Sequence, residues 1–337
     1  MIMNSLTANI TMFFTNYLSN TVGYSENTIK SYRDTFVLLF LYAEEEHLIK
    51  HGKISIELFY RDNIAAFLEW LELKRGSSVS TRNQRLAALK SFSRYMSLNT
   101  VEYLDTFQAV LDISPKKGPS KTVDYLTVEA ITLLLKEPDT DSYRGIRDLA
   151  ILSLLYESGC RVQELIDLKY GDLSLTSPAT ISVTGKGNKT RIIPISNKVV
   201  SILNKYTAIY KISDSTEMLF TNKQAKPLTR SGVAYILKKH SESARIKNPQ
   251  IFGMATIHPH VLRHSKAMHL LESGVNLIYI RDFLGHSSVI TTEIYAKSNP
   301  EIKRKYLEDA ASNIDISVNK FSEKEKESLL EWLKHNI

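Results

Sequence analysis

Residues 258–286 read HPHVLRHSKAMHLLESGVNLIYIRDFLGH, and this stretch decides how the rest of the chain is interpreted. The spacing of its apolar residues predicts two helices, near residues 260–273 and 275–284. Several histidines and Arg263 stand among these apolar residues, although composition alone does not require them there. The stretch therefore combines a helical fold with candidate functional side chains.

The remainder of the chain is also mainly helical by its hydrophobic periodicity. In the first hundred residues, Ser25 and Ser80 are candidate N-caps of such helices. Apolar residues at helical spacing predict helices near 7–20, 25–48, 60–75, 79–97, 100–110, 127–137, 142–158, 196–209, 230–244 and 299–310.

A single segment departs from the helical period. Residues 180–196, TISVTGKGNKTRIIPIS, alternate with period two and predict a hairpin with strands Thr180–Thr184 and Thr190–Ile195. Gly185 and Gly187 supply the permissive backbone that a tight turn needs. The predicted fold class is therefore mainly α with a small β-hairpin or sheet.

Length and charge restrict the domain count and the kind of partner. A chain of 337 residues with 43% hydrophobic residues favours two domains, each with its own core. Its formal charge of +7 and pI near 9.1 favour an acidic partner, which composition alone leaves open as DNA, RNA, an anionic membrane or an acidic protein. The single cysteine, Cys160, and the lack of a signal peptide or apolar span predict a cytoplasmic protein without a membrane partner.

Two segments mark the expected organisation. Residues 114–122, SPKKGPSKT, combine prolines, a glycine and lysines, so the interdomain linker is placed at 113–123, between domains at 1–112 and 124–310. The tail at 311–337 ends in a short helix that Ser322 and Glu325 introduce as a capping box. Its apolar stripe needs a surface to cover it, either on the same chain or on a neighbouring subunit.

Polar residues concentrate in five short segments. His260 and Arg263 fall one helical turn apart and share a face, which suits two donors directed at one oxyanion. Each of the other candidates also has an explanation without a functional role. Arg161 and Glu164 could form a simple ion pair at a helix start, Lys186 could lie at an ordinary hairpin tip, and Tyr295 could serve in packing. The segments are 159–165 (GCRVQEL), 185–187 (GKG), 258–264 (HPHVLRH), 284–286 (LGH) and 291–295 (TTEIY).

The histidines raise the alternative of a metal site. His260 and His264 stand four residues apart, but neither has the neighbouring Glu of an HExxH motif, and His258 and His269 add no recognised ligand spacing. Anion contact together with helix packing explains the cluster better. We therefore predict no metal, and we expect His264 to pack or to support its neighbours.

Taken together, these segments resemble the sequence boxes of the tyrosine recombinases. The order Arg, Lys, His-x-x-Arg, His, Tyr is far more specific as a set than any of its members, and the resemblance covers residues 124–310. The helical first hundred residues are similar in character to the core-binding domain of that family. The resemblance thus implies a helical core-binding domain that clamps DNA, followed by an α+β catalytic domain.

The resemblance also implies a role for each matched residue. Two arginines would clamp the scissile phosphate, a lysine would donate a proton, two histidines would complete the phosphate shell, and a tyrosine would attack to form a 3′-phosphotyrosyl bond. Because that bond stores the energy of the broken strand, neither ATP nor a metal or other cofactor is expected. In the same order, these residues are Arg161 and Arg263, Lys186, His260 and His286, and Tyr295.

The implied partner is double-stranded DNA carrying recombination sites, bound by a homotetramer that the C-terminal helix helps to assemble. Basic residues on the fourth predicted helix, in the linker and near residue 230 are candidates for DNA contact, although a solvated face or a soluble linker explains them as well. These candidates are Arg82, Arg85, Lys90, Lys116, Lys117, Lys121 and Arg230.

The predicted function is that of a site-specific DNA recombinase that integrates or excises a mobile element, as an integrase or transposase does. The alternatives are an Xer-type chromosome-dimer resolvase, a type IB topoisomerase, and a catalytically silent DNA-binding regulator. The complete set of six residues argues against the silent regulator.

Overall fold

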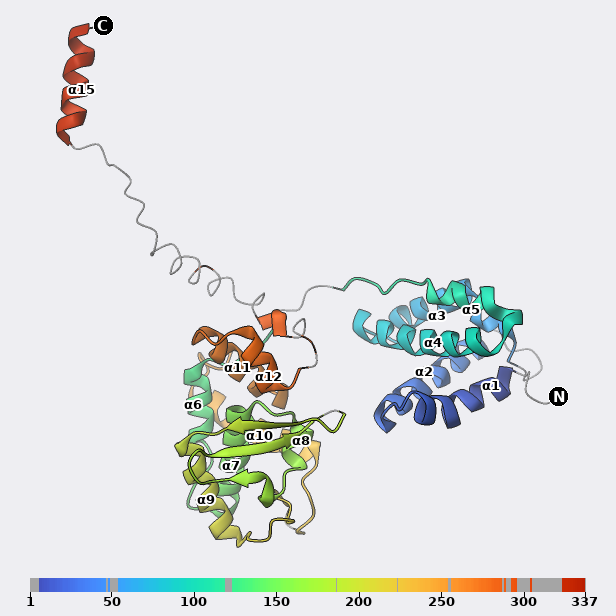
Figure 1. The fold of residues 1–337 in the computed structure, drawn as a ribbon, viewed down its shortest axis with the longest axis horizontal. Helices are drawn as coiled ribbons and strands as arrows, with labels where there is room; N and C mark the ends of the chain where they lie inside the picture. The colour runs from blue at the N-terminus through green and yellow to red at the C-terminus, as the bar shows by residue number, and fades with distance from the viewer. Residues whose placement is uncertain are drawn as a thin grey trace. The chain divides into compact units, whose positions relative to one another are not determined.

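The computed structural model describes residues 6–46, 48, 54–118, 123–185, 187–222, 224–253, 256–286, 288, 292–295, 304 and 323–336. The chain divides into two compact units, Met1–Ser120 and Lys121–Ile337 (Figure 1). Each unit has its own cluster of buried apolar side chains, so each is described by itself. The described residues are mainly helical with one small sheet, which confirms the predicted fold class.

All the regular secondary structure among the described residues of the first unit is helical. In chain order they are α1 (Leu6–Met12), the π-helical η1 (Phe13–Thr21), α2 (Glu26–Glu45), η2 (Ile56–Phe59), α3 (Arg61–Leu73), α4 (Val79–Asn99), η3 (Val101–Tyr103) and α5 (Leu104–Leu111). Phenylalanines from several of these helices meet edge to face in the core: the ring centroids of Phe36 and Phe92 lie 5.3 Å apart at 86°, and those of Phe92 and Phe107 5.8 Å apart at 87°. Such pairs stabilise a core beyond the burial of their area.

Serine side chains begin two of these helices. Ser25 caps α2, where its Oγ accepts a hydrogen bond from the Thr28 N–H at 3.4 Å. The cap of α4 is Ser78, whose Oγ accepts from the Thr81 N–H at 3.2 Å. The prediction of Ser80 as the cap is wrong because Ser80 already lies inside α4, whereas Ser78 has the extended backbone from which a side chain can reach the first turn.

The second unit combines helices with the sheet. Its elements are α6 (Val128–Lys136), α7 (Tyr143–Ser158), α8 (Val162–Ile166), η4 (Tyr170–Asp172), β1 (Leu173–Ser174), β2 (Thr180–Thr184), β3 (Thr190–Pro194), α9 (Asn197–Tyr210), α10 (Arg230–Lys247), α11 (Pro259–Glu272), α12 (Leu277–Leu284) and α15 (Glu323–Asn336). None of the helices in the described part of the chain is long and apolar enough to span a membrane.

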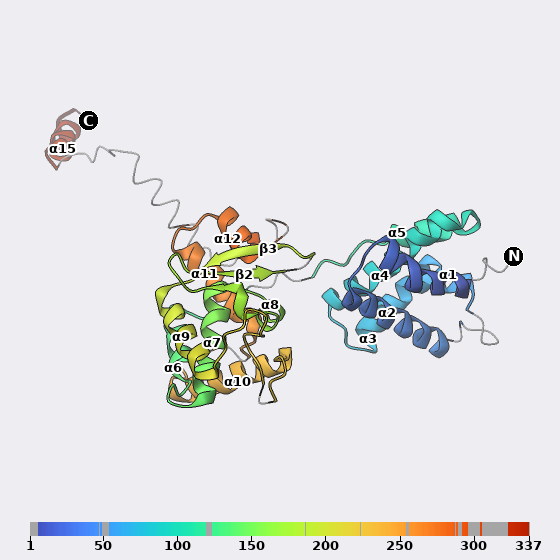
Figure 2. The same cartoon turned by 60° about the horizontal axis from the view of Figure 1, so that its bottom comes forward.

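The sheet is antiparallel with strand order β1, β2, β3. The predicted hairpin is present as β2 and β3 (Figure 2), with Val183 opposite Arg191 and Thr184 opposite Thr190, and β3 ends at Pro194, one residue before the predicted end at Ile195. Its turn closes through the Gly185 N–H, which donates to the Lys189 carbonyl at 2.9 Å. The sequence did not predict β1 or the short α8, because two-residue strands and single-turn helices carry too few residues to show a period.

Helix α7 is the centre of the second unit. Nearly every turn of it is buried, and it packs against α9 and α11. Leu152 and Leu155 of this helix share one cluster with Ile181 and Ile193 of the sheet. Since the sheet, α8 and α11 all rest on this core, the ends of these elements are held at fixed positions around the C-terminus of α7.

One serine cap in this core provides a stability test. Ser142 Oγ accepts from the Gly145 N–H at 3.0 Å at the start of α7 and donates to the Asp139 carbonyl at 2.9 Å. We expect Ser142→Ala to lower the free energy of unfolding by about 1 kcal/mol. Ser196→Ala is the matched control, because Ser196 precedes α9 with a similar backbone but makes no cap hydrogen bond. Urea unfolding followed by circular dichroism measures both, and equal losses would contradict the capping role.

Candidate functional site

The site begins where α7 ends. Gly159 ends this helix with a left-handed backbone, φ +54°, and a Cβ there would lie 3.0 Å from Leu284 Cδ2 and 3.2 Å from Phe283 Cε1. Both the left-handed backbone and the close approach of α12 therefore favour a glycine at this position. The chain then turns, and Arg161 occupies the N-cap position of α8.

Arg263 is the buried arginine of the site. Its side chain projects from α11, the residue is only 3% exposed, and its guanidinium donates to the Gly159 carbonyl at 2.6 Å and to the Leu284 carbonyl at 2.7 Å. Burial, followed by the charge of Arg161, lowers the pKa of Arg263 to about 10, so the group still carries its charge at neutral pH. Arg263 thus joins the ends of α7 and α12 and places a positive charge between them.

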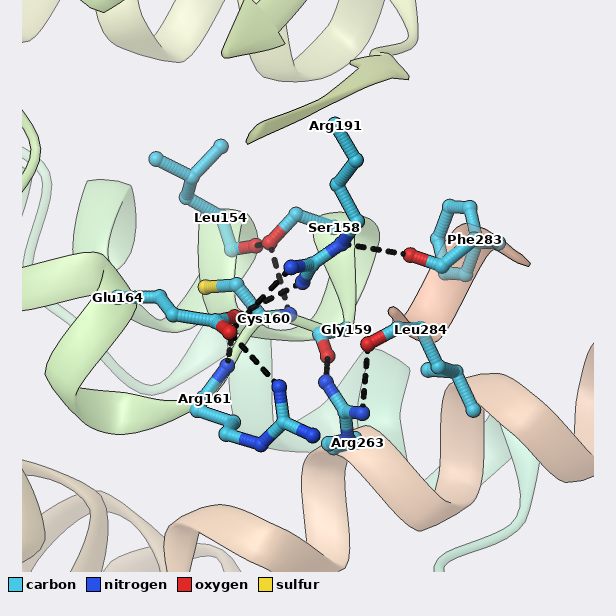
Figure 3. Close-up of polar contacts among 10 residues, drawn as sticks. All are labelled: Leu154, Ser158, Gly159, Cys160, Arg161, Glu164, Arg191, Arg263, Phe283 and Leu284. Atoms are coloured by element: carbon cyan, nitrogen blue, oxygen red, sulfur yellow. Dashed lines mark hydrogen bonds and ion pairs between the residues drawn. The ribbon is translucent and has the colours of Figure 1, made fainter. Parts of the chain in front are cut away.

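Glu164 organises the second arginine. Its carboxylate accepts from the Arg161 N–H and from the Arg161 guanidinium, both at 2.8 Å, and from the Arg191 guanidinium at 2.8 Å and 3.3 Å (Figure 3). Burial alone would raise the pKa of Glu164, but these hydrogen bonds from Arg191 and Arg161 lower it below its usual value. Glu164 is therefore an ionised carboxylate shared by two arginines.

The two candidate histidines are neutral near pH 7. Partial desolvation, followed by the charges of His258, Arg263 and Arg161, lowers the pKa of His260. Desolvation, followed by the charges of Arg263 and Arg161, lowers the pKa of His286 to about 4. Each imidazole therefore has one nitrogen that accepts and one that donates a hydrogen bond.

Tyr295 packs against α11 and α12, the two helices that meet at Arg263. It is 1% exposed and packs with Met268 of α11 and with Ile280 and Leu284 of α12. Burial raises the pKa of its hydroxyl above the ordinary value, while the charges of the two site arginines oppose that rise. The tyrosine is thus buried in apolar contacts and yet within the electrostatic reach of both guanidiniums.

The hydroxyl of Tyr295 has a specific partner. It forms a hydrogen bond of 2.9 Å with Nδ1 of His264. Burial, followed by the charge of His260, lowers the pKa of His264 to about 4. A second hydrogen bond, 3.0 Å long, joins Nδ1 of His286 to Thr292 Oγ1 and connects the segment 292–295 to the end of α12. Two neutral histidines therefore fasten the segment that carries the tyrosine.

The structure brings five of the six predicted catalytic residues into one region: the charges of Arg161 and Arg263 both lower the pKa of His260, of His286 and of Tyr295. Lys186 lies outside the described residues. The neighbouring Gly185 lies against the site, because a Cβ there would come within 2.9 Å of Glu164 Oε1.

The ion pair of Arg161 with Glu164 and a supporting role of His264 were both expected from the sequence, and the structure contains the ion pair at 2.8 Å and a hydrogen bond between His264 and Tyr295. The contacts of Arg191 with Glu164 and of Thr292 with His286 were not predicted. A signal for Arg191 was present, because alternation places it on the same strand face as the buried Ile193. No comparable signal marks Thr292, whose role depends on a contact across a turn.

The candidate DNA-contacting residues make several contacts within the chain. Arg85 donates to the Ser31 carbonyl at 2.8 Å, and Lys90 donates to the Leu111 carbonyl, so both fasten α4 to neighbouring helices. Lys116 pairs with Glu72 at 3.0 Å. Arg82 donates a hydrogen bond to the side chain of Asn83, and Arg230 donates one to the side chain of Gln163. Lys117 is exposed, and Lys121 lies outside the described residues.

Known proteins show the same organisation. Residues 124–301 match the phage integrase family, and residues 13–99 match the N-terminal SAM-like domain of phage integrases. The chain is 35% identical over 303 residues to a Sinorhizobium fredii protein named "Putative integrase/recombinase y4rC", covering 90% of this chain and 91% of the relative. It is 34% identical over 289 residues to tyrosine recombinase XerD of Staphylococcus haemolyticus, covering 84% of this chain and 92% of the relative.

Solved structures share the fold. XerH recombinase bound to its difH substrate in a pre-cleavage complex superposes with a TM-score of 0.63 at 22% identity, covering 84% of this chain and 79% of that one. The Tn1549 transposon integrase in complex with transposon right end DNA gives a TM-score of 0.66 at 17% identity, covering 89% of this chain and 98% of that one. The length and identity of the sequence matches, together with the site geometry, establish that the chain belongs to the phage integrase family of tyrosine recombinases, enzymes of site-specific DNA recombination.

Proposed function

We propose that this recombinase cleaves DNA with Tyr295 as the nucleophile and forms a 3′-phosphotyrosyl intermediate, which a 5′-hydroxyl of another strand then resolves. The observation that carries the proposal is that two charged guanidiniums, those of Arg161 and Arg263, lie close enough to lower the pKa of Tyr295 and also those of the imidazoles of His260 and His286. The only described carboxylate among these contacts is Glu164, and two arginines already share it. A group of this kind is complementary to an added anion such as a phosphodiester.

Each side chain has a chemical task in this proposal. Arg161 and Arg263 offer planar forks of donors to the non-bridging phosphate oxygens, where negative charge grows during attack. Neutral His260 and His286 donate one further hydrogen bond each, and either can accept the phenolic proton. Lys186 supplies the proton that the leaving 5′-oxygen needs, as the family resemblance implies.

The buried position of Tyr295 bears on how the reaction starts. To attack a phosphate, the hydroxyl leaves His264 and turns toward the arginines. Leaving the apolar cover removes the main cause that raises its pKa, while the arginines that lower the pKa remain beside it. Movement out of the core and activation of the nucleophile are thus the same event.

For its biological role, we propose integration or excision of a mobile element, with double-stranded DNA sites as the substrate. The similarity to a protein named as an integrase/recombinase supports this role, and the similarity to XerD supports resolution of chromosome dimers as the alternative. Recombination of two sites needs four protomers. Helix α15 supports such assembly, because Leu330 and Leu333 on it are 55% and 40% exposed.

The nucleophile is tested by Tyr295→Phe. We expect wild-type protein to form a covalent adduct on a nicked duplex carrying the sequence that it selects from a randomised DNA library, and we expect Tyr295→Phe to form none while binding the same DNA. Denaturing gel electrophoresis reads the adduct. Tyr279→Phe is the matched control, since Tyr279 is 71% exposed on α12, and it should react like wild type. An adduct on Tyr295→Phe would refute the assignment.

The hydrogen bond between His264 and Tyr295 is tested in the absence of DNA. We expect His264→Phe to keep the aromatic packing but to lose this bond, which contributes about 0.5–1.5 kcal/mol and corresponds to roughly 2- to 12-fold faster opening. Hydrogen exchange of the peptide containing residues 292–295 measures the opening. His258→Phe serves as the control, because His258 is exposed. Unchanged exchange in His264→Phe would mean that apolar contacts alone hold the tyrosine.

The biological role is tested by sequencing the DNA on either side of the gene. A mobile-element enzyme should lie between terminal repeats that the purified protein cleaves in the adduct assay. Flanking DNA without such repeats, combined with cleavage of a chromosomal site, would favour the resolvase instead.

A further inference from the structure

Arg191 connects three separate parts of the second unit. It lies on β3, and its side chain is 14% exposed. Its guanidinium donates to both oxygens of Glu164 on α8, and its Nε donates to the Phe283 carbonyl of α12 at 3.0 Å (Figure 3). One side chain thereby fixes the hairpin, the helix that follows Arg161, and the end of α12 in a single arrangement.

Two glycines lie directly against this arginine and its partner. A Cβ at Gly285 would come within 2.9 Å of an Arg191 terminal nitrogen and 3.2 Å of Cδ and Cζ. A Cβ at Gly185 would come within 2.9 Å of Glu164 Oε1 and 3.5 Å of the same arginine. In the sequence these glycines immediately precede His286 and Lys186. The backbone that leads into each of these two residues therefore rests on the pair of Arg191 and Glu164.

Arg191 also balances the charge of Glu164, which would otherwise fall on Arg161 alone. Glu164 contacts both Arg161 and Arg191, so the three groups together carry one net positive charge. Without Arg191, the buried carboxylate would have Arg161 as its only arginine partner among these contacts. Arg161 would then be neutralised by Glu164 and would stabilise the charge that grows on the phosphate during attack less well, because a buried carboxylate that loses one partner holds the remaining one more strongly.

We propose that Arg191 is a positioning residue for strand cleavage, which shares the charge of Glu164 so that Arg161 can stabilise the charge that grows on the phosphate during attack, and which holds the turn that carries His286. The inference rests on the proposed function. Arg191 acts through Arg161 and His286, and its own donors point at protein groups, so it contributes to the rate of cleavage and not to the affinity for DNA.

The test compares Arg191→Met, Arg191→Lys and the double variant Arg191→Met with Glu164→Gln. The readout is the rate of adduct formation at saturating nicked duplex, together with the dissociation constant for the same DNA. We expect Arg191→Met to lower the rate roughly 10- to 100-fold, the range for an outer partner of a preorganised site, and to leave the dissociation constant within about 3-fold. Arg191→Lys keeps the charge but loses the planar fork, and it should recover part of the rate.

The double variant separates charge sharing from simple support of the fold. Glutamine at position 164 still accepts a hydrogen bond from Arg161 but carries no charge to neutralise it, so the double variant should cleave faster than Arg191→Met. Arg147→Met is the matched control: Arg147 pairs with Asp148 at 2.8 Å, and the side chains are 13% and 4% exposed, against 14% and 5% for Arg191 and Glu164. It should cleave at the wild-type rate.

Three results would overturn the inference. They are a wild-type rate for Arg191→Met, a double variant no faster than Arg191→Met, or a loss confined to DNA affinity. If Arg191→Met does not fold, Arg191→Lys decides alone, and a rate as low as that of Arg161→Met would contradict charge sharing. Failure of the proposed function is distinguishable, because wild-type protein would then form no adduct at all.

Discussion

The buried carboxylate of Glu164 is the constraint on which the catalytic unit depends. A charge in a protein interior is tolerated only when opposite charges and hydrogen bonds replace the lost water, and Glu164 obtains these from Arg161 and Arg191. These two arginines come from different secondary-structure elements, the N-cap of α8 and strand β3. Satisfying one carboxylate therefore brings together the hairpin and the turn after α7, and Arg263 adds α11 and the end of α12 through two backbone carbonyls.

The same arrangement offsets the positive charge of the site with groups of the protein itself. The guanidinium of Arg263 is buried, but both of its hydrogen-bonded partners are carbonyl oxygens at the C-terminal ends of helices, where the helix dipole is negative. The two histidines avoid the cost of further charge by remaining neutral. In the proposed function, a bound phosphate supplies the negative charge that the protein groups of the site lack.

Much of this molecule could be predicted from its sequence. The helices and the hairpin around Gly185 follow from the spacing of apolar residues. The joint site of Arg161, His260, Arg263, His286 and Tyr295 was an implication of the resemblance to the tyrosine recombinases. The contact between His264 and Tyr295 could not be predicted, because the residues are 31 positions apart and their meeting depends on the packing of α11 against the segment 292–295. The cap at Ser78 and the role of Arg191 likewise depend on backbone angles and tertiary contacts that a local pattern does not encode.

Arg263 and His264 are consecutive residues of α11, and they face different tasks: one contacts the ends of α7 and α12, and the other holds the tyrosine hydroxyl. Consecutive helical side chains diverge by about 100°, so a single rigid helix presents both. A shift of α11 large enough to improve one contact necessarily alters the other. In the proposed reaction, phosphate binding by Arg263 and release of Tyr295 are therefore linked. Any free energy by which a bound phosphate favours release of the tyrosine is returned as tighter phosphate binding when the tyrosine is already free.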